Sequence, residues 1–118
     1  MIEGTWKLIS GEQNGEEEPK EDIERSKLVI DGNQHTVTIG DAVLRGTHTL
    51  DATKTPMTID ADDSAGPFEG MSLKGIFNVE DDVLTVCFAA PDQPRPTEFT
   101  TKSKKAVLMH VWKKESSE

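Results

Sequence analysis

The chain lacks several features that mark common classes of protein. Its 118 residues include one cysteine and no tyrosine, and aromatic residues make up 5%. Because Cys87 has no second cysteine to pair with, an internal disulfide is excluded and stability must come from packing. No segment approaches the ~20 apolar residues of a membrane helix, and no signal-peptide pattern opens the chain. We therefore expect a cytoplasmic protein that does not enter a membrane.

Basic residues are also scarce. There are 13 Lys and Arg against 22 Asp and Glu, which gives a formal net charge of −9 and a pI of about 4.7. Such a charge repels phosphate backbones, so we expect no nucleic-acid partner. Composition leaves the oligomeric state open. A chain of this length forms one domain, residues 1–118, and buries roughly two-thirds of its unfolded surface.

Alternation of apolar and polar residues is the dominant pattern of the chain. A period of two residues is typical of half-buried strands. Turn signals such as Asp-Gly-Asn at 31–33 separate these segments at spacings of about 8 to 15 residues. The expected strands are residues 4–12, 27–30, 35–39, 42–51, 55–61, 71–79, 83–89 and 105–114, with a further short one at 99–101, and 62–70 is expected as a loop.

This pattern predicts an all-β, eight-stranded antiparallel meander closed into a barrel. The first and last strands are both apolar, and they carry Trp6 and Trp112. Left open, they would be exposed edges, and pairing them protects both. The one helical candidate, residues 16–26, has Pro19 in its first turn and a single apolar residue, Ile23, which predicts a short surface helix.

Four stretches carry a resemblance to a known family. They are GTWKLISGEQNG at the start, LDATKTPMTID, GIFNVEDDVLTVCFAAPDQPRPTEF and the last apolar strand. Together they resemble a family of small uncharacterised bacterial domains, best known from planctomycetes and described as lipocalin-like. The resemblance implies the lipocalin-like barrel fold, with Trp6 packed across a closed end and a basic residue, Lys113 or Lys114, near the end of the last strand. That family has no established activity, so the resemblance implies no function.

Ligand-binding candidates come from the faces that the strands are expected to turn inward. Gly46, Gly75 and Ala61 fall on these faces, where their small size leaves room inside the barrel. We expect a site in the barrel interior or at its mouth, formed by Arg95, His48, His35, Phe77, Phe88 and Met57.

The segment PDQPRPTEF, residues 91–99, has two interpretations. Its prolines restrict the backbone, which suits a rigid brace between the last two strands. In that interpretation Arg95 pairs with Glu98 or with an acid on a neighbouring loop, and Phe99 enters the barrel end. In the other, Arg95 binds a ligand carboxylate at the barrel mouth.

Sequence motifs for catalysis, metals and cofactors are missing. His35, His48 and His110 show no close ligand spacing, there is no Gly-x-Ser-x-Gly or phosphate loop, and the acids at 60–66 lack calcium-loop order. We therefore expect no enzyme, no catalytic residue, no metal and no cofactor. The main hypothesis is a non-enzymatic binding module for a small apolar or amphipathic ligand. The alternative is a filled barrel with a structural or protein-interaction role, and a cavity of several hundred cubic ångströms favours the first.

Overall fold

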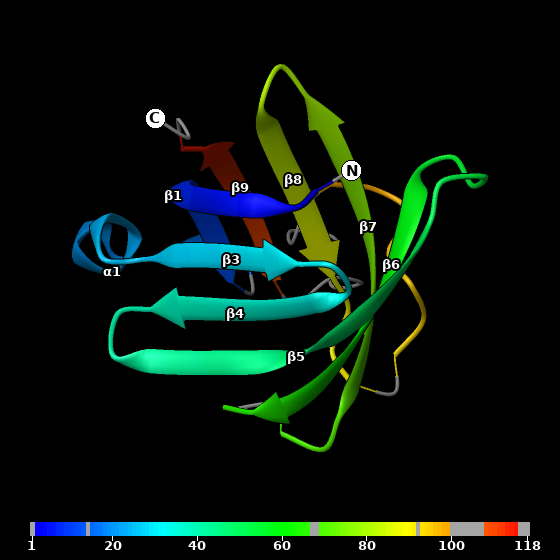
Figure 1. Cartoon of the computed structure of the whole chain (residues 1–118), viewed down its shortest axis with the longest axis horizontal. Helices are drawn as coiled ribbons and strands as arrows, with labels where there is room; N and C mark the ends of the chain where they lie inside the picture. Colours follow the sequence, from blue (N-terminus) through cyan, green and yellow to red (C-terminus); the bar gives the residue numbers. More distant parts are fainter. Residues whose placement is uncertain (1, 14, 67–68, 92, 100–107, 116–118) are drawn as a thin grey trace.

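A computed structural model describes residues 2–13, 15–66, 69–91, 93–99 and 108–115. The chain forms one closed antiparallel barrel with a very short helix beside it (Figure 1). Its elements are β1 (Gly4–Gln13), β2 (Glu16–Glu17), α1 (Lys20–Glu24), β3 (Lys27–Asp31), β4 (Gln34–Ile39), β5 (Ala42–Asp51), β6 (Met57–Ala65), β7 (Ser72–Glu80), β8 (Val83–Phe88) and β9 (Leu108–Lys114).

Eight of these strands form the barrel, which confirms the predicted fold class. The order runs β1-β3-β4-β5-β6-β7-β8-β9, and β1 pairs with β9 to close the wall. The closing register joins Trp6 to Lys114 and Leu8 to Trp112, and it is irregular between Leu8 and Ser10. Strand β2 is a two-residue addition that pairs only with the end of β1. Closure therefore removes the apolar edges that the first and last strands would otherwise expose.

The main core lies inside the barrel and includes both tryptophans. Trp6, Trp112, Phe77 and Leu84 are each 1% exposed, which confirms the predicted burial of Trp6. The indole Nε1 of Trp6 donates a hydrogen bond of 2.9 Å to the carbonyl of Ile2. Lys114, which pairs with Trp6 where β1 meets β9, places its Nζ 5.8 Å from the centre of the Trp6 ring. This distance lies within the range of a cation–π contact.

Some local expectations were wrong. Strand β6 continues to Ala65, although residues 62–65 were expected in a loop, because alternation persists there: Asp63 is buried while Asp62 and Ser64 are exposed. Helix α1 has only five residues, and Pro19 sits just before it rather than in its first turn. The short strand expected at 99–101 and the start of the last strand at 105–107 fall mostly outside the described residues. In the described part of the chain, no helix is long and apolar enough to span a membrane.

Candidate functional site

The barrel interior contains a cavity of about 90 Å³. Its walls are largely apolar and come from most of the barrel strands. They include Leu28, Ile30, Val37, Leu73, Val86 and Phe88. Four polar side chains also line it: His35, His48, Asp63 and His110. The cavity is therefore an apolar space with polar groups at a few defined points, which is the usual composition of a ligand site.

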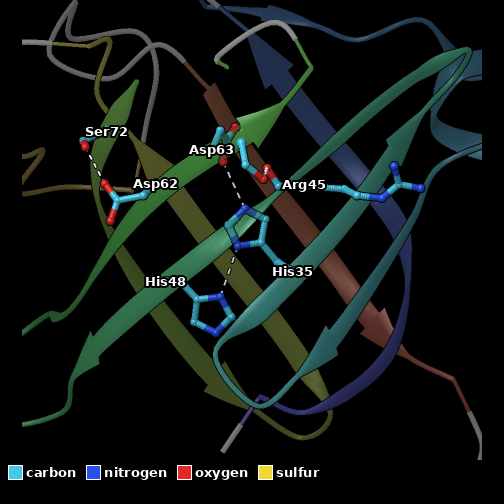
Figure 2. A network of polar contacts seen from close by, with 7 residues as sticks. His35, Arg45, His48, Asp62, Asp63 and Ser72 are labelled. Carbon is cyan, nitrogen blue, oxygen red and sulfur yellow. Dashed lines mark hydrogen bonds and ion pairs between the residues drawn. The ribbon is translucent and has the colours of Figure 1, made fainter. Parts of the chain in front are cut away.

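Three of the polar side chains form a chain of hydrogen bonds across neighbouring strands. His35 on β4 places its Nε2 3.0 Å from Oδ1 of Asp63 on β6. Its other nitrogen, Nδ1, is 3.1 Å from Nδ1 of His48 on β5. Figure 2 shows the carboxylate and the two imidazoles in this order. The side chains of His35 and Asp63 are only 10% and 4% exposed, so both contacts are shielded from solvent.

A local irregularity in the sheet directs Asp63 at His35. Arg45 pairs with Ala65 and Gly46 pairs with Asp63, so β6 carries one extra residue there, a β-bulge. The bulge comes so close to β5 that a Cβ on Gly46 would lie 2.2 Å from the carbonyl oxygen of Asp62. Only glycine fits that position. Gly46 also pairs with His35 on its other side, so the same residue brings the carboxylate and the imidazole together.

The backbone of Asp63 is fixed as well. Its N–H donates to the carbonyl of Met71 at 3.1 Å, and its carbonyl accepts from the N–H of Gly70 at 2.8 Å. Asp62, the next residue back, is exposed and accepts a hydrogen bond from the hydroxyl of Ser72 (Figure 2). Two adjacent acids thus have separate partners, one inside the barrel and one outside.

His48 ends this chain with an unused nitrogen. The residue is 5% exposed, and its Nε2 is buried without a hydrogen-bond partner. Burial, followed by repulsion from His35, lowers the pKa of His48, while the Gly32 carbonyl and Glu3 oppose the shift. Burial therefore favours the neutral form of His48, in a ring that also has the Gly32 backbone beside it.

A second buried pair lies at another part of the wall. His110 on β9 places its Nε2 2.7 Å from Oε1 of Glu18, and the side chains are 6% and 10% exposed. Glu18 follows β2, and its N–H donates to the carbonyl of Gly11 at 2.9 Å. A Cβ on Gly11 would lie 3.0 Å from atoms of both Glu18 and His110, so glycine leaves room for this pair. Oε2 of Glu18 has no hydrogen-bond partner.

The predicted site residues separate into three groups. His35, His48 and Phe88 line the cavity, as expected from their inward faces. Phe77 is buried in the core and Met57 packs against that core, but neither lines the cavity. Ligand contact by any of them stays a prediction. Sequence reasoning missed Asp63, although its period-two spacing from Ile59 and Ala61 on the inward face was a usable signal.

Arg95 lies on the outer side of the barrel wall and does not line the cavity. Its Nη2 donates to the carboxylate of Asp60 at 2.6 Å. Its Nη1 donates to the carbonyls of Gly75 at 2.9 Å and Ile59 at 3.2 Å. The expected acidic partner therefore exists, but it is a residue within β6 and neither Glu98 nor a loop acid. These three acceptors contact both Nη atoms of the guanidinium that was considered for a ligand carboxylate.

The described residues of the proline-containing segment, 91 and 93–99, contact the outside of the barrel wall, and their role as a brace stays a prediction. Phe99 does not enter the barrel end. It packs on the outer face of β7, β8 and β9, together with Ile76, Cys87 and Met109. These residues alternate with inward-facing ones, so their side chains need a cover on the outside, and Ile76 and Cys87 are 1% and 0% exposed beneath it.

Within the part of the chain that the structure describes, no group of three or more His, Cys, Asp or Glu residues is arranged to hold a metal ion. Comparisons with protein-family models, curated proteins and solved structures give no match. The resemblance to lipocalin-like bacterial domains stays a prediction from its motifs. Any proposal of function must start from the cavity itself.

Proposed function

We propose that this chain is a non-enzymatic module that binds a small, mostly apolar molecule inside its barrel. The observation that carries the proposal is a mostly apolar cavity inside the barrel, with a few polar side chains at defined points of its wall. Ligand sites commonly combine apolar walls with a small number of polar groups that orient the ligand. A small ligand with an apolar body and one polar group suits such a cavity.

The volume limits the size of the ligand. About 90 Å³ corresponds to roughly three water molecules at ~30 Å³ each, and a cavity of ~150 Å³ is known to accept benzene. The site therefore suits a molecule smaller than benzene. Ligand pockets for larger compounds measure about 300–1,000 Å³, so a fatty acid requires movement of the lining side chains.

A filled barrel with a structural or protein-interaction role is the second candidate. The specific observation in its favour is the same small volume, which falls below the several hundred cubic ångströms set above for a binding module. In that case the cavity is a packing defect, and no small molecule binds it in a saturable way. The two candidates therefore differ in one measurable property.

The test is a titration of isotope-labelled protein with pyrrole, furan, 2-butanol and 2-butanone, followed by NMR. We expect saturable shifts that centre on cavity-lining residues such as Leu73 and Val86. Ala61→Leu fills the cavity from β6 and should abolish them, whereas Ala52→Leu, the same change in an exposed turn, should not. Lack of saturable binding by all four probes would contradict the proposal and favour the filled barrel.

A further inference from the structure

His35 and His48 contact each other through the same kind of atom. Their Nδ1 atoms are 3.1 Å apart, and Figure 2 shows the two rings joined at this point. A hydrogen bond between two imidazole nitrogens needs a proton on one of them and a lone pair on the other. The contact therefore holds one proton and only one, whichever of the two rings carries it.

This requirement limits the charge that the pair of rings can carry. With one positive charge on the pair, one ring is still neutral and its Nδ1 can keep a lone pair, so the contact remains. With two charges, every ring nitrogen carries a proton, two N–H groups face each other and the hydrogen bond is lost. The contact thus tolerates one charge and excludes a second, and this holds for either arrangement of the protons.

The groups that face the pair balance one charge. Asp63 on β6 lies 3.0 Å from Nε2 of His35, and its side chain is 4% exposed, so one buried carboxylate stands beside the two rings. The Gly32 carbonyl, in the turn before β4, favours a proton on His48, and Glu3 does so to a smaller extent. A first charge on the pair therefore has partners.

Other ionisable groups of the neighbouring elements are directed elsewhere. On the strands β3 to β6, the exposed ones are Lys27, Asp31, Arg45, Asp60 and Asp62. His110, which also lines the cavity, has a carboxylate of its own, since its Nε2 is 2.7 Å from Oε1 of Glu18. Among the described residues, Asp63 is thus the one buried acid in contact with the His35–His48 pair.

The second charge is therefore expected only in acid. Burial, followed by repulsion from His35, lowers the pKa of His48 from its usual 6.5. Charging both rings removes the bond between them and places two like charges at close range inside the barrel wall. The rings then have to separate, and both side chains line the cavity.

We infer that the His35–His48 contact is a pH-sensitive latch in the cavity wall, which holds at neutral pH and opens in acid when both rings are charged. A charged imidazole needs water, and a cavity of about 90 Å³ has room for roughly three water molecules. An open latch therefore leaves no room for a small apolar ligand. The inference rests on the proposed function and adds to it the regulation of the same site.

The test measures the affinity for furan and for 2-butanol as a function of pH. Neither probe gains or loses a proton between pH 5 and pH 8, so any pH dependence belongs to the protein. Linkage to one proton weakens binding by up to about tenfold per pH unit. We expect NMR titrations of the folded protein to show binding at least about tenfold weaker at pH 5 than at pH 8.

The same substitution at two cavity histidines gives the matched comparison. His48→Gln keeps a polar side chain opposite His35 but cannot take a charge, so binding should lose most of its pH dependence. His110→Gln keeps an N–H donor toward Glu18 and leaves the latch intact, so it should retain the pH dependence of the wild type. His48→Phe, which has no polar group at all, should behave like His48→Gln.

Nitrogen NMR of the imidazoles tests the latch without a ligand. At pH 8 one of the two Nδ1 atoms should carry a proton and the other should not. On acidification both should become protonated, in a step that also shifts the signals of cavity-lining residues such as Leu73 and Val86. The step should persist in His110→Gln and be absent in His48→Gln.

The outcomes separate the inference from the function that it extends. Equal affinity at pH 5 and pH 8, or a pH dependence that survives His48→Gln and disappears in His110→Gln, overturns the inference and leaves small-molecule binding intact. Two protonated Nδ1 atoms at pH 8, or global unfolding before the second ring is charged, overturn it as well. Failure of both probes to bind at any pH contradicts the proposed function, and the nitrogen spectra still decide whether the latch exists.

Discussion

Trp6 and His48 are two buried aromatic side chains of the same barrel interior, and they use their ring nitrogens differently. Trp6 is 1% exposed and His48 is 5% exposed. The Nε1 of Trp6 donates to the carbonyl of Ile2, whereas Nε2 of His48 has no partner. Trp6 belongs to the packed core and does not line the cavity, but His48 does.

The difference separates the tightly packed part of the interior from the part that surrounds the cavity. A buried polar atom without a partner costs about 1–3 kcal/mol. The packed region around Trp6 is satisfied and should carry much of the stability. The region around His48 retains an unsatisfied atom, which should cost stability. Substitutions in the two regions should therefore have unequal effects on unfolding and on binding.

The largest effect is expected for Trp6→Ala. Truncation of a fully buried tryptophan should lower the free energy of unfolding by about 3–5 kcal/mol, measured by urea denaturation. Trp6→Phe is the matched control: it keeps a ring and loses the bond to Ile2, so a smaller loss is expected. A loss below about 1 kcal/mol for Trp6→Ala would contradict its assignment to the core.

A smaller effect is expected for Phe99→Ala on the outside of the barrel. Phe99 is half-buried, and its removal uncovers the outward-facing pair Ile76 and Cys87. We expect a loss of about 1–3 kcal/mol in the same measurement. Met71→Ala, at an exposed apolar residue, should change stability by less than about 0.5 kcal/mol. Equal effects of the two substitutions would mean that segment 91–99 does not brace the wall.

Arg95→Gln should have a smaller effect again. The side chains of Arg95 and Asp60 are 28% and 52% exposed, and such pairs contribute only about 0.2–1 kcal/mol. The two bonds to backbone carbonyls add to this, so we expect a loss of about 0.5–1.5 kcal/mol. Arg45→Gln, at an exposed site on β5, is the control and should be neutral. Unchanged stability together with lost binding of an anionic ligand would show that Arg95 is functional and that the brace is not its role.

Sequence alone was sufficient for the fold because the dominant signal was local. Period-two alternation and tight turns specified most strands, and the apolar character of the two ends specified closure. The same alternation placed His35 and His48 inside correctly. The same alternation also placed Asp63 on the inward face. Residues 62–70 were nevertheless expected as a loop, because the acids and turn-forming residues there were given more weight than the alternation at a single position.

The rest could not be predicted because it depends on contacts between distant segments. Arg95 reaches Asp60, which is 35 positions away in the sequence, and Glu18 reaches His110 across 92. Strand parity identifies which residues face inward but does not give the free volume, so the small size of the cavity was not foreseen. The outward face of β7 and β8 was apolar enough to require a cover, and this was the available clue that Phe99 would lie outside.

The smallest change in stability is expected for His48→Phe. The substitution removes the unpartnered Nε2, but it leaves Nδ1 of His35 without its partner, so one unsatisfied atom replaces another. At pH 8 the free energy of unfolding should therefore change by no more than about 1 kcal/mol, far less than for Trp6→Ala.

The same variant should alter the pH dependence of unfolding. Because burial lowers the pKa of His48 below 6.5 in the folded protein, the unfolded chain binds a proton first as the pH falls. The contribution of His48 to stability is thus fully present above about pH 6.5, and it is lost as the pH decreases from there through the lower folded-state pKa. His48→Phe should lose this part of the acid slope, while Asp62→Asn should retain it, in urea titrations at pH 8, 6.5 and 5. A loss of several kcal/mol at pH 8, or an unchanged slope, would place His48 with Trp6 as a structural residue and remove the contrast between them.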